Sequence, residues 1–212
     1  MNTEILKFVL GPLQNNTYLI TAPDNQEAVI VDPASGISTV LNIIEKKALN
    51  LSQIWITHAH FDHIAGLREI IPLIKEFPIS IGLHPNDLPL WRSGAGARQF
   101  GMSFHVDIDP NLYFQDQQIL TVGKSNWTVL HTPGHTPGHV SFHNADTDTI
   151  LCGDVIFREG VGRTDLPGGD HGVLIQSILH RLLRYPPHTR LYCGHGEDTT
   201  VQHELKFNPF LK

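Results

Sequence analysis

The chain has 212 residues, of which 41% are apolar, and it carries a formal net charge of −6 with a pI near 6.1. A chain of this size can bury a large core, and its acidic balance gives no basic field for a nucleic acid. No apolar run reaches membrane-spanning length. We therefore expect one domain over residues 1–212, with a small-molecule substrate and neither a nucleic-acid nor a membrane partner.

The N-terminal half alternates predicted strands and helices. Runs of β-branched and aromatic residues between turn signals predict strands over residues 4–10, 16–20, 27–33, 53–57 and 78–84. Helical periodicity covers residues 38–48 and resumes at Ile64, where Pro72 is expected to kink or divide the helix. Asn15-Asn16 indicates a turn before the second strand.

The C-terminal half opens with residues 85–116, which show no clear periodicity. Within them the segment SGAGARQFG reads as a surface loop, or as a lid if it caps a site. Four further runs predict strands over residues 118–123, 127–132, 139–144 and 149–154. A helix over 173–183, a strand over 190–195 and a short C-terminal helix complete a mixed α/β (α+β) pattern.

Polar side chains gather where several predicted strands end. Ligand sites in open sheets lie at the carboxyl ends of strands, and these positions carry His58, His60, Asp62, His63, His135, Asp154 and His195. Imidazole and carboxylate groups without a thiolate indicate an open site for zinc, iron or manganese. The set is too large for one tetrahedral ion and suits two ions that share a bridge and hold a hydroxide.

Other polar residues have simpler interpretations. Asp32 either accepts a hydrogen bond from a ligand histidine or is a turn residue before Pro33, and His139 and His171 stay undecided. Cys152 and Cys193 are predicted to be small buried residues at strand ends, because two cysteines cannot form a disulfide framework. The remaining histidines are interpreted as ordinary satisfied or exposed side chains: His84, His105, His131, His143, His180, His188 and His203.

Four segments, THAHFDH, TPGHTPGH, CGD and GHG, resemble in this order the metallo-β-lactamase superfamily. The resemblance covers nearly the whole chain and implies a four-layer αββα sandwich with a dinuclear site at one edge. It also implies a first metal on His58, His60 and His135, a second on Asp62, His63 and His195, and a bridge at Asp154.

Within the superfamily, GDVIFREGVGRTDLPGGD and KFNPFLK are similar to the glyoxalase II branch, the hydroxyacylglutathione hydrolases. The likeness is to short bacterial forms without the C-terminal helical domain. Arg163 stands where full-length enzymes carry a lysine that holds the glycyl carboxylate of glutathione. Asp165 and Glu197 replace tyrosines and add negative charge near this anionic peptide.

The resemblance implies a metal-dependent thioester hydrolase that cleaves S-hydroxyacylglutathione, such as S-lactoylglutathione, by a metal-bridged hydroxide. Asp62 would orient that hydroxide electrostatically, Arg163 would bind substrate, and the cofactors would be two divalent ions, zinc first, with iron or manganese open. The main alternative is a persulfide dioxygenase with one iron on His58, His135 and Asp154.

Three further readings of the fold carry less support. A non-enzymatic metal-binding module would not need every ligand position filled, and a processing ribonuclease would need a basic exosite. A β-lactamase would require export, whereas Glu4 and Lys7 interrupt the apolar run of a signal peptide. We therefore expect a cytoplasmic enzyme.

Overall fold

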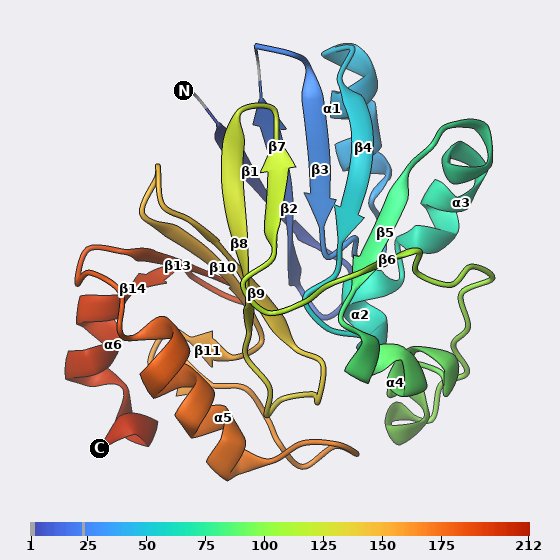
Figure 1. Cartoon of the computed structure of the whole chain (residues 1–212). Helices are drawn as coiled ribbons and strands as arrows, with labels where there is room; N and C mark the ends of the chain where they lie inside the picture. The colour runs from blue at the N-terminus through green and yellow to red at the C-terminus, as the bar shows by residue number, and fades with distance from the viewer. Residues whose placement is uncertain (1–2, 23) are drawn as a thin grey trace.

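Two six-stranded β-sheets lie face to face in the structure, a computed structural model that describes residues 3–22 and 24–212. Helices cover the outer face of each sheet, and the chain completes one sheet before it enters the other (Figure 1). Within the described ranges, no helix is long and apolar enough to cross a membrane.

The first sheet has the strand order β1-β2-β3-β4-β5-β6, antiparallel from β1 to β3 and parallel from β3 to β6. Its strands are β1 (Glu4–Leu10), β2 (Asn15–Ala22), β3 (Glu27–Val31), β4 (Asn50–Trp55), β5 (Ser80–Leu83) and β6 (Leu112–Tyr113). Its outer helices are α1 (Ser38–Lys46), α2 (Phe61–Ile64), α3 (Leu67–Glu76) and α4 (Leu88–Arg92), with 3₁₀ turns η1 (Pro85–Asp87) and η2 (Ala97–Phe100).

The second sheet has the order β14-β13-β10-β9-β8-β7, in which only β10 and β13 are parallel neighbours. Its strands are β7 (Ile119–Val122), β8 (Ser125–His131), β9 (Val140–Asn144), β10 (Thr149–Gly153), β13 (Arg190–Cys193) and β14 (Thr199–Thr200). A small hairpin of β11 (Ile156–Phe157) and β12 (Gly160–Val161) follows β10. The outer helices are α5 (His171–Ser177), which continues as the π-helical turn η3 (Ile178–Leu182), and α6 (Val201–Phe207), followed by η4 (Pro209–Leu211).

Three apolar layers hold these elements together. Ile54 and Ile70 belong to the layer between the first sheet and its helices. Trp55 and Trp127 meet between the two sheets, with ring centroids 5.9 Å apart, and Leu174 of α5 lies in the layer beneath the second sheet. Since three apolar layers separate four layers of secondary structure, the predicted αββα sandwich is confirmed.

The helix after the histidine cluster is broken at a different place from the one predicted. Pro72 lies inside α3 and does not divide it; the break separates α2 from α3 at Gly66. The amide of Gly66 donates to the carbonyl of Pro33 at 2.8 Å, and a Cβ there would lie 2.3 Å from the carbonyl oxygen of Ala34. Close packing against the chain after β3, and not the proline, therefore ends α2.

The turn before the second strand lies slightly earlier than Asn15-Asn16 indicated. It covers residues 11–14, whereas Asn15 and Asn16 are both buried in β2, which contains the predicted strand over residues 16–20. Residues 85–116, where the sequence showed no clear periodicity, contain four short elements at the edge of the first sheet. These elements and the predicted ligands lie on the same edge.

Candidate metal centre

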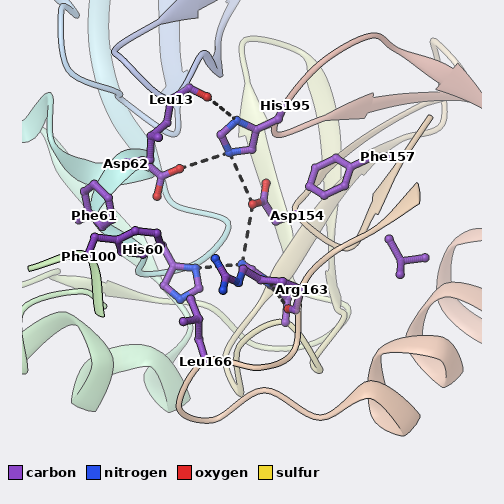
Figure 2. A pocket seen from close by; sticks show the side chains of 12 residues that line it. Leu13, His60, Phe61, Asp62, Phe100, Asp154, Phe157, Arg163, Leu166 and His195 are labelled. Carbon is purple, nitrogen blue, oxygen red and sulfur yellow. Dashed lines mark hydrogen bonds and ion pairs between the residues drawn. The ribbon is translucent and has the colours of Figure 1, made fainter. Parts of the chain in front are cut away.

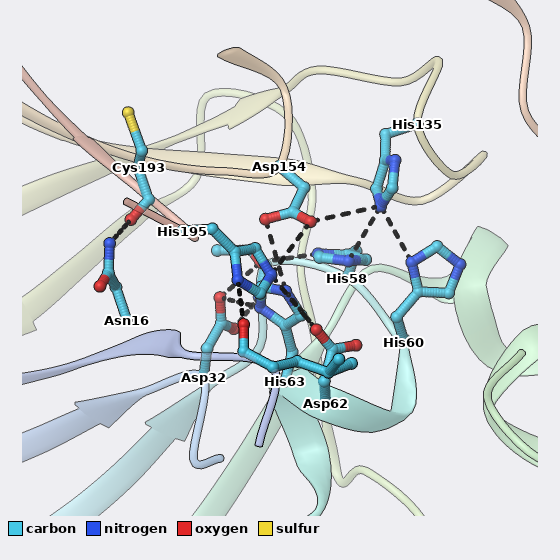
Figure 3. Close-up of polar contacts among 12 residues, drawn as sticks. Asn16, Asp32, His58, His60, Asp62, His63, His135, Asp154, Cys193 and His195 are labelled. Atoms are coloured by element: carbon cyan, nitrogen blue, oxygen red, sulfur yellow. Dashed lines mark hydrogen bonds and ion pairs between the residues drawn. The ribbon is translucent and has the colours of Figure 1, made fainter. Parts of the chain in front are cut away.

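The seven predicted ligands lie together at one edge of the two sheets, and we call this group the metal centre (Figure 3). The first sheet supplies four of them from one segment, where the chain leaves β4 and enters α2. The second sheet supplies three, one after each of β8, β10 and β13. The members are His58, His60, Asp62, His63, His135, Asp154 and His195.

Three buried histidines form the first half of the metal centre. The Nε2 atom of His135 lies 3.2 Å from Nε2 of His58 and 2.9 Å from Nδ1 of His60. Burial lowers the pKa of all three imidazoles, and together with His135 it brings the pKa of His60 to about 3. These rings are therefore neutral at pH 7, and each keeps one nitrogen lone pair.

Hydrogen bonds on the outer side of two rings fix where the lone pairs point. Nδ1 of His135 donates to the carbonyl of Arg163 at 2.7 Å. Nδ1 of His58 lies 3.0 Å from the hydroxyl of Thr57, which itself donates to Asp32 at 2.7 Å and so accepts from the ring. Because the outer nitrogens carry the protons, both Nε2 lone pairs face the interior of the centre.

Two carboxylates and two histidines form the second half. Oδ2 of Asp62 lies 3.2 Å from Nε2 of His195 and 3.6 Å from Nε2 of His63. Asp154 lies between the halves, with Oδ1 3.4 Å from Nε2 of His63 and Oδ2 3.8 Å from Nε2 of His135. Although burial opposes the change, Asp154 and Asp62 raise the pKa of His63. The two acids make this half of the centre an attractive place for cations.

The donor atoms fit metal ions. Ligand atoms of one four-coordinate ion with bonds of zinc length lie about 3.4 Å apart, close to the 3.2, 3.4 and 3.6 Å separations found here. Two buried atoms that could bind a metal, Nε2 of His63 and Oδ1 of Asp154, have no hydrogen-bond partner among the described residues. Such atoms are costly to bury unless an ion satisfies them.

Asp32 adopts the hydrogen-bonded alternative of the two that its sequence position allowed. Its carboxylate accepts from the Nδ1 of His63 at 3.0 Å and from the backbone amide and hydroxyl of Thr57, both at 2.7 Å. The backbone of Asp32 has φ +51°, a strained conformation for a residue with a side chain. One carboxylate thus orients His63 directly and His58 through Thr57.

Asp87 is a residue of the metal centre's surroundings that the sequence did not reveal. Its carboxylate accepts from the amide of Ala59 at 2.9 Å, the hydroxyl of Thr136 at 2.8 Å and the amide of Gly138 at 2.6 Å. Ala59 lies among the ligands of the first sheet and Thr136 among those of the second. Asp87 therefore ties the two ligand loops together, and its one sequence signal is its place just after β5.

Asn16 has a comparable role on the other side. Its side-chain amide donates to the carbonyls of Cys193 and Gly196 at 2.9 and 3.0 Å, which fixes the loop of His195 on β2. A Cβ at Gly194 would lie 2.0 Å from Oδ1 of Asp154, so only glycine fits there. Packing thus requires glycine in the GHG segment, independently of any role of His195 as a metal ligand.

The two histidines left undecided lie outside the set of ligands. Nδ1 of His139 donates to the hydroxyl of Thr132 at 2.9 Å, and its Nε2 accepts from the amide of Asp154 at 3.1 Å. Both ring nitrogens of His139 are therefore satisfied, and the residue positions the backbone of Asp154. His171 is exposed at the start of α5.

A pocket of about 410 Å³ opens beside the metal centre (Figure 2). Five of the seven centre residues line it, and Arg163 lies at its side. The rest of the lining is a group that we call the apolar wall: Leu13, Phe61, Phe100, Phe157, Val161 and Leu166. Phe100 comes from the segment SGAGARQFG, which therefore forms part of the pocket instead of a remote surface loop.

Arg163 lies where a substrate contact was predicted, but its guanidinium already has a partner. Its Nε and Nη2 donate to the two carboxylate oxygens of Asp165, each at 2.7 Å. The guanidinium carbon is 5.7 Å from the ring centroid of Phe100. The backbone of Arg163 serves the metal centre through His135, while its side chain lies at the pocket rim.

The chain is similar to known proteins along most of its length. The profile described as "Metallo-beta-lactamase superfamily" matches residues 10–195. The chain is 36% identical to "Probable metallo-hydrolase YqgX" of Bacillus subtilis, covering 95% of this chain and 94% of that protein. It is also 36% identical to "Hydroxyacylglutathione hydrolase GloC" of Haemophilus influenzae, over 100% and 98% of the two chains.

Solved structures show the same architecture. The chain superimposes on BLEG-1 B3 metallo-beta-lactamase with a TM-score of 0.90 and 34% identity, covering 99% of this chain and 100% of that one. TTHA1623 in a di-iron-bound form gives a TM-score of 0.84 with 38% identity, over 97% and 100% of the two chains.

Proposed function

The chain belongs to the metallo-beta-lactamase superfamily of metallo-hydrolases, and on that premise we propose that it hydrolyses thioesters with two divalent metal ions. The proposal rests on one observation: the side chains needed to bind two metal ions are all present. They form two groups that meet at Asp154, beside an open pocket. The similarity to a hydroxyacylglutathione hydrolase supports a thioester, with S-lactoylglutathione as the first substrate to test.

Each half of the metal centre would hold one ion. His58, His60 and His135 offer three lone pairs to the first, Asp62, His63 and His195 offer donors to the second, and Asp154 reaches both. When bound, such ions supply a water that is deprotonated at neutral pH and a Lewis acid for the substrate carbonyl. Zinc suits these donors, and the di-iron form of TTHA1623 keeps iron as the second choice.

The residues of the chain then position the reactants. Asp62 lines the pocket, and its carboxylate can accept a hydrogen bond from the attacking water and orient it. The water oxygen adds to the thioester carbonyl carbon, the C–S bond breaks, and the acid and the thiol leave. Water is the nucleophile in this proposal, because no serine or cysteine is found among the described residues that line the pocket.

The test is a comparison of metal-replete and metal-free protein. We expect about two metal ions per chain by elemental analysis, and hydrolysis of S-lactoylglutathione by the replete form alone. Thiol release equal in the two forms would contradict the proposal. So would the absence of thioester hydrolysis in protein that holds both ions.

A persulfide dioxygenase with one iron on His58, His135 and Asp154 is the second reading. A second group of possible ligands, Asp62, His63 and His195, whose ligand atoms lie within 4.8 Å of one another, favours the hydrolase. One iron per chain, together with oxygen uptake on glutathione persulfide, would reverse this choice.

β-Lactam hydrolysis is a third candidate, favoured by the similarity to BLEG-1. A chromogenic cephalosporin in the same assay tests it. A cephalosporin hydrolysed with a higher kcat/KM than any thioester would make that activity the primary one.

A further inference from the structure

We propose that the substrate is a thioester of an apolar carboxylic acid on a carrier without a carboxylate at the pocket rim, and that Asp165 sets this preference by neutralising Arg163. The inference rests on the proposed thioester hydrolysis and concerns which thioester the pocket takes. It is carried by two independent features, the apolar wall and the ion pair at the rim.

The apolar wall surrounds the space where an acyl group would lie. Phe61 and Phe100 pack with ring centroids 5.5 Å apart, and Leu13 and Phe100 are each 46% exposed beside the metal centre. An exposed apolar surface next to a site marks a surface that a ligand covers. An aliphatic or aromatic acyl chain would cover it.

A hydroxyacyl group has no dedicated partner in this pocket. Among the described side chains of the lining, the polar ones belong to the metal centre or to Arg163. No serine, threonine, asparagine or tyrosine side chain of the lining is available to bond a hydroxyl group. A lactoyl group would therefore gain less from the wall than an apolar acyl group of similar size.

The rim also disfavours an anionic carrier. Arg163 is the one lysine or arginine among the described lining residues, and both oxygens of Asp165 already bind it. Glu197 does not line the pocket, and its carboxylate lies 3.6 Å from the guanidinium of Arg158. A carboxylate of glutathione would therefore have to displace Asp165 from Arg163.

The first experiment separates the acyl group from the carrier. Metal-replete protein is assayed with lactoyl and phenylacetyl thioesters of glutathione and of N-acetylcysteamine, a neutral thiol. On the same carrier, we expect kcat/KM to be at least about tenfold higher for the phenylacetyl group, the discrimination that an apolar pocket typically achieves. With the same acyl group, the neutral carrier should be hydrolysed at least as well as glutathione.

The second experiment frees Arg163. Asp165→Asn keeps the shape of the side chain and removes its charge, so Arg163 can bind a glutathione carboxylate. The probe is S-butylglutathione, a thioether that cannot be hydrolysed, and binding is measured by calorimetry on metal-free protein. We expect about fivefold tighter binding in Asp165→Asn, the upper range for an exposed ion pair.

Asp109→Asn is the matched control, since it breaks an exposed pair with Arg92 that does not line the pocket. It should bind the thioether as the wild type does. Higher kcat/KM for S-lactoylglutathione than for the phenylacetyl thioesters, or unchanged binding in Asp165→Asn, would overturn the inference. If no thioester is hydrolysed the proposed function fails, and the binding arm still tests the role of Asp165.

Discussion

The metal centre and the apolar wall border the same pocket, yet their side chains are held in different ways. In the metal centre, four histidines have their outer nitrogens bound to a carbonyl, a carboxylate or a hydroxyl. The side chains of the wall are apolar and cannot form such bonds, although the backbone carbonyl of Leu13 is the partner of His195. These side chains are held by packing, and those of Phe100 and Leu13 are partly exposed. We therefore expect the centre to fix the chemistry and the wall to select the substrate, as proposed above.

Removing the metal should have the largest effect on activity and stability, because it takes both ions out of the centre at once and leaves the wall unchanged. Without metal, two buried atoms of the centre, Nε2 of His63 and Oδ1 of Asp154, have no hydrogen-bond partner among the described residues. A ligand at free concentration c that binds only the folded state stabilises it by RT ln(1 + c/Kd), so removing the metal removes this stabilisation. We expect a chelator to abolish hydrolysis and to lower Tm by on the order of 10 °C. Differential scanning fluorimetry measures the shift, and zinc or iron should restore it. An unchanged Tm would show that the centre holds no ion.

Asp154→Asn should have the next largest effect. Asp154 contacts histidines of both halves of the centre, and an amide can neither carry its charge nor serve both halves. We expect kcat/KM to fall by more than the roughly 10–100-fold that loss of an outer hydrogen-bond partner causes. Elemental analysis should show less than two ions per chain. A variant with full metal content and full activity would remove Asp154 from the centre.

Asp87→Asn tests the connection between the two ligand loops. In the asparagine side chain, an NH₂ group replaces one of the two carboxylate oxygens. This NH₂ group would face hydrogen-bond donors, either the amide of Gly138 or the amide of Ala59 and the hydroxyl of Thr136. We expect metal affinity to fall by roughly 10–100-fold, with kcat recovered at high metal concentration. Titration of apo protein with a competing chelator measures the affinity. Asp109→Asn, on the same segment but exposed, should match the wild type.

The centre could be predicted from the sequence and the wall could not, for a physical reason. Ligands need particular atoms, so His58, His60 and Asp62 stand out in one short segment, and the ends of predicted strands indicated where the others would meet. The wall needs only apolar side chains, and in the sequence Phe100 cannot be distinguished from apolar residues of the core or of the exposed surface. Asp87 escaped notice because its partners are backbone groups of distant loops, which leave no mark in the local sequence.

The ion pair between Arg163 and Asp165 could be predicted only in part. The resemblance to hydroxyacylglutathione hydrolases implied that both residues lie near the substrate, and the structure adds that they bind each other. Spacing alone does not tell whether two charges two positions apart face each other or a ligand. Their mutual pairing changes the expected role of Arg163 from a free anion contact to a neutralised one.

Phe100→Ala should have the smallest effect and should be confined to the wall. Phe100 is 46% exposed, so its loss should change stability little, within about 0.5 kcal/mol. An apolar acyl group would lose one face of its contact, and we expect KM for a phenylacetyl thioester to rise about fivefold, near 1 kcal/mol of lost burial, at unchanged kcat. The control is Met102→Ala, since Met102 directly follows the segment SGAGARQFG, is 44% exposed and does not line the pocket. If Phe100→Ala instead lowered kcat or metal content, the wall would be part of the metal centre's support, and the separation of selection from chemistry would not hold.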